Sequence, residues 1–375
     1  MPKLPTAKTL TNAPPMNGWR RVKFGDVVEC VNDTVADPQA AGVERVVGLD
    51  HLDPGSLHIK RWASIEDGTT FTRRFKSGQV LFGKRRAYQR KLAVAEFDGI
   101  CSGDILVFEP KNDGLSPELL PFIMQTEGFW QHALNTSAGS LSPRTKWQDL
   151  ARYEFALPPK DEQHRIAEIL WAADETIENY KCALHTLADL FSATLAETTK
   201  AGRRTNFGEL VKLASGERKP DRLSAYSSTN HPHPVFGGNG VIGFAATPLV
   251  TEPKIIVGRV GEYCGNVQRS RVSCWVTDNA LYVKERQGGV DFDFLYYAMT
   301  AANFNRLRKV AGQPLVSQRE IYECEVFLPS LREQKEMAAR MIHIETVQSG
   351  CVIHLDNLGE LKRRLISEQF SEDYV

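Results

Sequence analysis

LPPKDEQHRIAEIL, at residues 157–170, returns 171 positions later as LPSLREQKEMAARM, at residues 328–341. Both stretches share a Leu-Pro-x-x-x-Glu-Gln phrase and continue into a long amphipathic pattern. Proline suits the first turn of a helix, and an early carboxylate favours the positive N-terminal end of the helix dipole. The phrase therefore predicts a helix start at two equivalent points of the chain. Its matching residues are Leu157, Pro158, Glu162, Gln163, Leu328, Pro329, Glu333 and Gln334.

Behind each phrase, apolar residues recur three and four positions apart for several heptads, which is typical of a coiled-coil seam. The residues predicted to form the seam are Ile166, Leu170, Ile177, Leu184, Leu187, Phe191, Met337, Met341, Ile344, Leu358 and Leu361. Two narrow seams are best buried against each other. The predicted central helix, 157–200, and distal helix, 328–375, are therefore expected to form an antiparallel coiled coil. Two unrelated helices in two separate cores are the alternative.

Two further echoes precede each phrase in the same order. RRVKFGDVV at 20–28 matches RRTNFGELV at 203–211, and LPFIMQTEGF at 120–129 resembles LYYAMTAANF at 295–304. An ordered set of echoes indicates a tandem duplication. The blocks before the helices, 17–156 and 201–327, contain short apolar runs such as QVLFG and KIIVGRV that predict strands, together with helical segments. The predicted class is α+β, with two tandem domains, two long helices and a pseudo-twofold internal repeat.

Composition predicts a folded chain without a membrane span. The 375 residues are 42% apolar and 25% charged, and 46 basic residues balance 46 acidic ones. No apolar run reaches the length of a transmembrane helix. Residues 1–16 lack the apolar centre of a signal peptide and are expected to be flexible. Seven scattered cysteines without a Cys-x-x-Cys pair favour reduced thiols, hence a cytoplasmic protein.

A basic segment in the first block predicts contact with DNA. RRFKSGQVLFGKRRAYQRK, at 73–91, has no acid and interleaves aromatic residues, and SAGSLSPRTKW, at 137–147, adds two cations. Such cations neutralise phosphates, and arginine can bind guanine edges in the major groove. The candidate DNA-binding residues are Arg73, Arg74, Lys84, Arg85, Arg86, Tyr88, Arg90, Lys91, Arg144 and Lys146. A solvated strand–loop face is the alternative.

The second block offers a smaller candidate set. GRVGEYCGNVQRSR, at 258–271, mixes arginines with a tyrosine, and one glutamine occupies the loop that corresponds to 137–147. The candidates are Arg259, Tyr263, Gln268, Arg269, Arg271 and Gln313.

Motifs that resemble catalytic sites carry little weight in this sequence. Gly238-x-Gly240-x-x-Gly243 formally matches a dinucleotide fingerprint, but FAATP follows it, so a turn is predicted instead of a helix. His231 and His233 lack further ligands at zinc spacing. An Asn/Asp-Pro-Pro-aromatic motif of amino-group methylation is absent from the sequence. The sequence therefore predicts no catalytic residue and no bound metal.

The ordered motifs resemble the specificity subunit of type I restriction–modification systems. The resemblance covers nearly the whole chain beyond residue 17 and is carried by LPPKDEQHRIA, its echo at 328–338, and the Phe-Gly-Asp/Glu openings. It implies that 17–156 and 201–327 are target-recognition domains, each reading half of a split asymmetric DNA site. It also implies that the helices set the half-site spacing and that the Leu-Pro phrases have a structural role.

The same resemblance implies the partners. Two methyltransferase subunits, which bind S-adenosylmethionine, dock on the helices, and restriction/translocase subunits that use ATP and Mg²⁺ join them. This chain then binds no cofactor of its own.

Three alternatives remain at this stage. The chain could be a stand-alone DNA-binding protein or the targeting subunit of a related anti-phage system. It could be a metal-dependent nuclease that uses Asp221, Glu252 and Lys254. It could also be a coiled-coil adaptor without a nucleic-acid partner.

Overall fold

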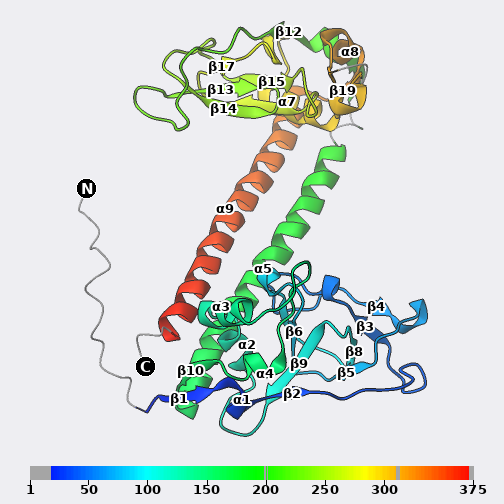
Figure 1. Ribbon diagram of the computed structural model, residues 1–375. Helices are drawn as coiled ribbons and strands as arrows, with labels where there is room; N and C mark the ends of the chain where they lie inside the picture. Colours follow the sequence, from blue (N-terminus) through cyan, green and yellow to red (C-terminus); the bar gives the residue numbers. More distant parts are fainter. Residues whose placement is uncertain (1–17, 198–199, 201, 310–312, 371–375) are drawn as a thin grey trace. The chain divides into compact units, whose positions relative to one another are not determined.

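The computed structural model describes residues 18–197, 200, 202–309 and 313–370, and its chain divides into two compact units. The first unit holds the residues up to Asn179 together with those from His354 onward, and the second holds Tyr180–Ile353. Each unit contains one β-rich domain and part of both long helices (Figure 1). The segment 1–16, predicted to be flexible, lies outside the described residues.

Two four-stranded sheets form the domain of the first unit. One has the order β2–β9–β6–β7 and is antiparallel; the other has the order β4–β3–β8–β5 and pairs β3 with β8 in parallel. The strands are β2 (Val28–Val31), β3 (Arg45–Val47), β4 (Ala63–Ser64), β5 (Arg73–Phe75), β6 (Val80–Gly83), β7 (Leu92–Val94), β8 (Gly99–Cys101) and β9 (Ile105–Pro110). The predicted strand QVLFG contains β6, at the centre of its sheet.

Alternation along β6 and β9 supplies two separate cores. Successive side chains of a strand point to opposite faces. Phe82 and Phe108 join the large cluster that also receives residues of the long helices, whereas Leu81 and Val107 join a second cluster with residues of the other sheet. A continuous apolar run is therefore required in both strands, because both faces of the sheet are covered.

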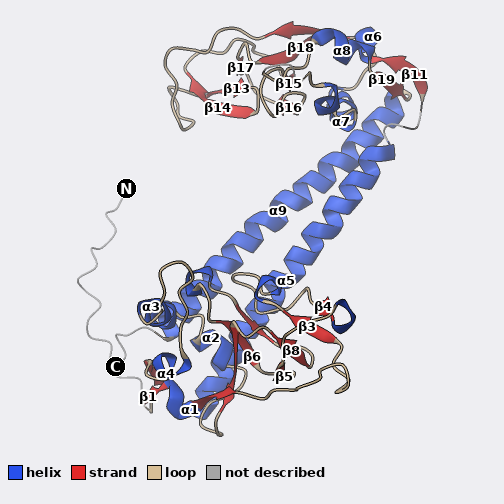
Figure 2. Cartoon of the chain, turned by 45° about the vertical axis from the view of Figure 1, so that its right-hand side comes forward, coloured by secondary structure: helices blue, strands red, loops and turns tan. Residues whose placement is uncertain are grey.

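The second unit repeats this arrangement with one strand fewer among its described residues. Its sheets have the orders β12–β18–β15–β16 and β14–β13–β17, and β13 and β17 again pair in parallel (Figure 2). The strands are β12 (Val211–Ser215), β13 (His233–Gly237), β14 (Gly240–Ala245), β15 (Lys254–Gly258), β16 (Val267–Ser270), β17 (Trp275–Val276) and β18 (Ala280–Arg286). The glycines of GGNGVIG lie in and around the β13–β14 hairpin turn, as the sequence predicts.

Each domain begins and ends on one antiparallel strand pair. β1 (Arg20–Lys23) pairs with β10 (Glu154–Leu157), which places Arg20 opposite Leu157. β11 (Arg203–Asn206) pairs with β19 (Glu325–Leu328), which places Arg203 opposite Leu328. The Arg-Arg echo and the Leu-Pro phrase thus meet in both halves, so each domain closes where its long helix begins.

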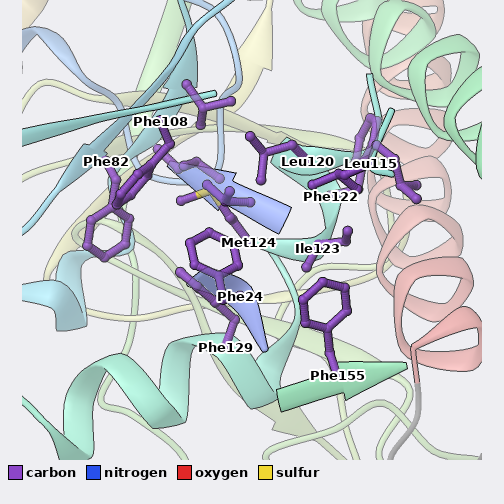
Figure 3. Packing of buried hydrophobic residues seen from close by; sticks show 14 of the residues in the cluster. Phe24, Phe82, Phe108, Leu115, Leu120, Phe122, Ile123, Met124, Phe129 and Phe155 are labelled. Carbon is purple, nitrogen blue, oxygen red and sulfur yellow. The ribbon is translucent and has the colours of Figure 1, made fainter. Parts of the chain in front are cut away.

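The sequence echoes also supply equivalent core contacts. Phe24 packs on Phe129 with ring centroids 5.2 Å apart, and the equivalent Phe207 packs on Phe304 at 5.4 Å. Figure 3 shows Phe24 and Phe129 side by side in the first core. These side chains are fully buried, and truncating one such phenylalanine to alanine costs about 3–5 kcal/mol.

Short helices carry these aromatic residues and close the domains. They are α1 (Phe24–Val27), α2 (Leu120–Ile123), α3 (Glu127–Asn135) and α4 (Trp147–Leu150) in the first domain and α6 (Phe207–Leu210), α7 (Phe292–Ala301) and α8 (Gln318–Glu323) in the second. Single turns of 3₁₀ helix are η1 (Leu49–His51), η2 (Ile65–Asp67), η3 (Ala87–Gln89) and η4 (Phe304–Leu307).

The long helices α5 (Lys160–Glu197) and α9 (Leu331–Gln369) are in contact within each unit. In the first unit, Asp174 of α5 forms an ion pair with Lys362 of α9. In the second, Glu197 of α5 lies 3.8 Å from Arg340 of α9. The early part of each helix thus meets the late part of the other, so the pair is antiparallel. These contacts confirm the predicted α+β class with paired long helices.

The apolar residues of these helices differ in their burial. Those nearest the domains are buried, namely Ile166, Leu170, Ile177, Met337, Met341 and Ile344. Those further along are half-buried, namely Leu184, Leu187, Phe191 and Leu358. Leu361 is 47% exposed, and its neighbour Lys362 is buried in its place. Gly350 and Gly359 each cost about 1 kcal/mol in a helix interior, but α9 continues through both.

Candidate nucleic-acid interface

The loop that follows β6 is hydrogen-bonded to two distant segments. The Lys84 amide donates to the Asp104 carbonyl at 2.9 Å, and the Thr145 amide donates to the Lys84 carbonyl at 3.0 Å. The Arg86 amide donates to the Pro143 carbonyl at 2.8 Å. Two of the predicted basic segments therefore form one surface, residues 84–91 and 138–145, which we call the first loop surface.

Two arginines in this loop adopt a left-handed backbone. Arg86 has φ 55° and Arg90 has φ 50°, and η3 lies between them. This conformation costs an L-residue roughly 1–2 kcal/mol, and such residues cluster at functional sites. The two bends present Tyr88 with 56% of its surface exposed.

The second domain builds the same loop after β15. The Arg259 amide donates to the Asn279 carbonyl, the Val316 amide donates to the Arg259 carbonyl and the Gly261 amide donates to the Pro314 carbonyl, each at 2.9 Å. Residues 259–266 and 313–316 form what we call the second loop surface.

The bends of the second loop fall at equivalent places. They are made by Gly261, with φ 101°, and Gly265, with φ 88°. Between them Tyr263 is 55% exposed.

The hydrogen-bond patterns make Tyr88 and Tyr263 equivalent. Each tyrosine lies five positions after the glycine that ends its strand, Gly83 or Gly258. The spacing GKRRAY and GRVGEY is the sequence signal that identifies the loop, and neither charge nor periodicity reveals it. Both residues are predicted site residues, and the structure brings each to the exposed tip of its domain's loop.

Asp104 organises the cations of the first loop surface. Its carboxylate accepts a hydrogen bond from Arg144 Nε at 2.8 Å and lies 3.4 Å from Arg85 Nη1. The bond from Arg144 is the main reason that the pKa of Asp104 is lowered. Arg85 also donates to Ser142 Oγ at 3.2 Å. Arg85 and Arg144 are therefore held in place, and part of their charge is neutralised.

The other cations of the first basic segment have different surroundings. Arg90 donates to Glu127 at 2.7 Å, and Lys91 donates to the Leu49 carbonyl at 2.7 Å. Arg73 and Arg74 lie on β5, an edge strand of the other sheet. Arg74 lines a hollow of about 360 Å³ there together with Arg45. The structure thus distributes the segment 73–91 over more than one surface. Lys146 is exposed and stands at the N-cap position of α4, where its side chain forms no capping hydrogen bond.

Two predicted residues of the second domain lie beside its loop surface. Arg259 lines a hollow of about 580 Å³ with Arg319 and Tyr322. Gln313 and Tyr263 line a smaller one of about 210 Å³.

The remaining candidates of the second domain, Gln268, Arg269 and Arg271, belong to or follow β16. Arg271 donates to Asp293 of α7 at 2.7 Å, and Arg269 forms an ion pair with Glu345 of α9. The two arginines therefore face acidic residues of this chain.

The glutamines of the Leu-Pro phrases have the same partners in both halves. Gln163 donates to the carbonyls of Pro158 and Gly114 and accepts from the Ser116 amide at 2.8 Å. Gln334 donates to the carbonyls of Pro329 and Gly289 and accepts from the Asp291 amide at 2.7 Å. Both side chains are 1% exposed. Each glutamine fastens its helix start to the domain.

The glutamates of the Leu-Pro phrases lie in the first turns of α5 and α9. Glu333 accepts the Ser330 amide at 2.9 Å, which caps the first turn of α9. Glu162 pairs with Arg165, and this contact lowers the pKa of Glu162. Leu157 is fully buried, and Leu328 is partly buried beside the second core.

The two acids of the nuclease alternative each lie beside a different basic residue. Glu252 lies 3.4 Å from Lys254, whereas Asp221 is highly exposed and lies 3.8 Å from Arg218. Within the described part of the chain, no three acidic, histidine or cysteine side chains are grouped as metal ligands. No helix in the described ranges has the length and apolar content to cross a bilayer.

Comparisons with known proteins point to one family. Residues 53–186 match the model of the type I restriction modification DNA specificity domain. The EcoprrI specificity subunit of Escherichia coli is 27% identical over 171 residues, which cover 43% of this chain and 42% of that protein. The EcoDI specificity subunit of the same species is 33% identical over 190 residues, covering 48% and 40%. The chain thus matches less than half the length of these curated relatives.

Two solved structures share the fold. The type I restriction–modification S subunit from M. genitalium superposes with a TM-score of 0.70 and 14% identity, covering 95% of this chain and 96% of that one. A chain from a study of complex assembly and conformational transition of the type I system superposes with a TM-score of 0.55 and 18% identity, covering 96% and 100%. The family model and the curated relatives match this chain to type I restriction–modification specificity subunits, and the two solved structures share its fold.

Proposed function

We propose that this chain directs a type I restriction–modification complex to a bipartite, asymmetric DNA site and that it contributes no catalytic residue. One observation carries the proposal. The same strained or glycine-dependent loop is built twice, after equivalent strands, with an exposed tyrosine at its tip and different side chains around it. A shared frame with different side chains is what two readers of different half-sites require.

The chemistry of the two loop surfaces supports DNA contact. Lys84, Arg86 and Arg144 in the first surface can neutralise phosphates, and arginine can also bind guanine. In the second surface, Arg259 can do the same, and the exposed Gln313 amide can pair with adenine. Lys146 adds an exposed cation beside the first loop surface.

Two DNA-binding domains of modest affinity bind more tightly when they are linked. The second binding event becomes intramolecular, and it is favourable only when the DNA presents both half-sites at a suitable separation. We infer that the helix pair sets this separation.

The helix pair is also the proposed docking site for partners. Apolar side chains remain exposed on it, including Leu190 at 50%, Val352 at 46% and Ile353 at 60%. Large apolar side chains left exposed on a helix are candidates for contact with partner subunits. Two methyltransferase subunits dock there and supply S-adenosylmethionine, and restriction/translocase subunits bring ATP and Mg²⁺. The complex assembles in the cytoplasm.

Sequencing of methylated bases in single DNA molecules tests the proposal. Genomic DNA is compared between cells with and without the gene, with the partner genes expressed in both. One bipartite motif methylated on adenine should disappear with the gene and return with a plasmid copy. An unchanged set of methylated motifs, in cells whose methyltransferase is shown to be present, would contradict the proposal.

Protein purified from the cells that carry the gene distinguishes the alternative functions. A stand-alone DNA-binding protein would purify without a methyltransferase subunit. A nuclease would cleave DNA with Mg²⁺ as the isolated chain, and Glu252→Ala would abolish that cleavage.

A further inference from the structure

Each long helix carries an acidic residue at the same position. Asp174 of α5 and Glu345 of α9 are 171 residues apart, the offset that also separates Gln163 from Gln334. The Asp174 side chain is 4% exposed and that of Glu345 is 28% exposed. A charged group of this kind near a helix seam requires compensation by partners.

Asp174 lies where the first domain meets both helices. Its carboxylate accepts a hydrogen bond from His58 Nε2 of the domain at 3.0 Å and forms an ion pair with Lys362 of α9. The other ring nitrogen of His58 is 2.5 Å from Glu96. Lys362 lies over the Phe122 ring, 5.4 Å from its centroid. One buried carboxylate therefore joins three parts of the first unit.

Glu345 has the same place in the second unit. It forms an ion pair with Arg269 of the domain and accepts a hydrogen bond from the Tyr297 hydroxyl at 2.8 Å. Arg269 lies over the Tyr296 ring at 4.2 Å, and Phe191 of α5 packs on Tyr297 at 6.2 Å. The carboxylate of α9 thus contacts the domain directly, and α5 joins the same cluster through Phe191 and Tyr297.

The surrounding positions correspond as well. Phe122 and Tyr297 stand at the same place in the echoes LPFIMQTEGF and LYYAMTAANF, and Phe191 and Lys362 are separated by the helix offset of 171. Both units thus keep an acidic and an aromatic residue at these positions. The cation differs, because Lys362 comes from α9 and Arg269 from the domain. The duplication has preserved the junction while most of its side chains changed.

These contacts oppose sliding and rotation. A buried polar residue in a helix seam fixes register, because any shift leaves it without a partner. Breaking one partner of a buried pair leaves an uncompensated charge and is strongly unfavourable. A domain that pivots away from its helix breaks the contact of His58 or Arg269.

We propose that Asp174 and Glu345 are positioning residues that fix the orientation of each DNA-binding domain on the helix pair, and so determine which half-site separation the protein accepts. This inference rests on the proposed function. Asp174 and Glu345 contact no DNA in this scheme and act through His58, Lys362 and Arg269.

The test uses the assembled complex of this chain with its methyltransferase subunits. Duplexes carry the methylated motif with its natural spacer or with a spacer one or two base pairs shorter or longer. We expect the wild-type complex to lose affinity by about tenfold or more when the spacer changes. Asp174→Asn and Glu345→Gln should reduce this discrimination to less than about threefold, while the affinity for the natural duplex falls only modestly.

Matched controls are available on the same helices. Glu175→Gln and Glu336→Gln remove exposed acids of α5 and α9 and should leave spacer discrimination unchanged. Asp174→Glu keeps the charge and should restore most of the discrimination. His58→Ala removes only the domain's contact and leaves Asp174 paired with Lys362, so it serves if Asp174→Asn fails to fold.

The proposed function and the positioning role are contradicted by different results. Absence of bipartite binding by the wild-type complex would overturn the proposed function. Sharp spacer discrimination retained by folded Glu345→Gln and His58→Ala complexes would overturn the positioning role alone.

Discussion

At the scale of single residues, Gln163 and Gln334 give the repeated phrase its physical purpose. Each side chain satisfies two carbonyls and one amide in a place that water does not reach. An amide side chain is required because it both donates and accepts. A glutamate would lack the donors, and an apolar residue would leave all three backbone groups unpaired.

Replacing Gln163 with alanine should therefore destabilise the first unit. The loss strands buried backbone groups, so we expect a decrease of about 2–4 kcal/mol in the free energy of unfolding. Urea unfolding followed by tryptophan fluorescence measures it, because Trp19, Trp62, Trp130, Trp147 and Trp171, five of the six tryptophans, lie in the first unit. The exposed Gln148→Ala variant is the control and should change stability little. Equal stability of the Gln163→Ala and Gln148→Ala variants would contradict this role of the Gln163 side chain.

Tyr88 and Tyr263 lend themselves to a paired experiment. Because both loops present the residue regardless of the bases to be read, we expect a contact with the DNA backbone. A hydrogen bond to a charged group contributes about 1.5–3 kcal/mol. Tyr88→Phe and Tyr88→Ala should therefore weaken binding to target and unrelated DNA by similar factors, as should the same changes at Tyr263. Fluorescence anisotropy measures both.

The ratio of affinities for target and unrelated DNA decides this prediction. It should stay constant for the tyrosine variants. Tyr226→Phe, at an exposed tyrosine that is not among the residues of the two loop surfaces, is the control. A variant that loses target binding while keeping its affinity for unrelated DNA would instead assign the tyrosine to base recognition.

At the scale of elements, the two loops reach one backbone shape by different routes. The second uses Gly261 and Gly265, which adopt positive φ freely. At Gly265 a Cβ would stand 2.3 Å from the Asn305 amide nitrogen, so only glycine fits. The first domain accepts the strain of Arg86 and Arg90 and gains two cations. The domains thus share geometry and differ in charge.

The contacts around Asp174 and those around Glu345 should differ in how their contribution to stability depends on pH. The hydrogen bond with Asp174 raises the pKa of His58 to about 9, burial opposes this and Glu96 adds to it. Burial would raise the pKa of Asp174, but contacts with His58 and Lys362 outweigh it and the pKa is lowered. The folded-state pKa of His58 exceeds the unfolded value of about 6.5. Its contribution to stability is therefore complete below about pH 6.5 and is lost as the pH rises through about 9.

Urea unfolding of the wild type and of His58→Ala across this range measures the effect. The difference in free energy of unfolding between them should be largest near pH 6 and should shrink toward zero above pH 9. The second junction is the control, because Arg269 keeps its charge throughout and its pKa is raised further. The effect of Glu345→Gln should not vary over the same range. A His58→Ala difference that is constant with pH would contradict the assignment.

At the scale of the whole molecule, the two halves of the duplication share their packing residues and differ in the side chains of their loops. Core pairs, strand pairs and helix starts recur because each domain must fold and close in the same way. Loop side chains diverge, as the proposed reading of two different half-sites requires.

Lengthening both long helices should change the accepted DNA spacer. Seven residues inserted in the middle of α5 and of α9 keep the seam in phase and add about 10.5 Å to each helix. At 3.4 Å per base pair, the preferred spacer should grow by about three base pairs. Sequencing of methylated bases in cells that express the variant measures this. A five-residue insertion, which rotates the seam by about 140°, should instead abolish assembly. An unchanged spacer in a folded, active variant would show that the helices do not set it.

The sequence by itself determined the duplication, the two helix starts and the α+β class. These depend on local rules, because proline position, heptad spacing and strand alternation are set by neighbouring residues. The residues of the core pairs Phe24–Phe129 and Phe207–Phe304 stand in matching echoes, but the tertiary structure decided that they pack on each other.

Only the tertiary structure decided what each charged residue does. Arg86 and Arg269 both appear in basic segments, yet one lies in a loop beside Pro143 and the other pairs with Glu345. Likewise the helix pattern does not show that Asp174 and Lys362 are buried together. Charged side chains take their roles from partners far away in the chain, here 76 and 188 residues away for Arg269 and Lys362. No local pattern encodes such partners, because folding alone brings them together.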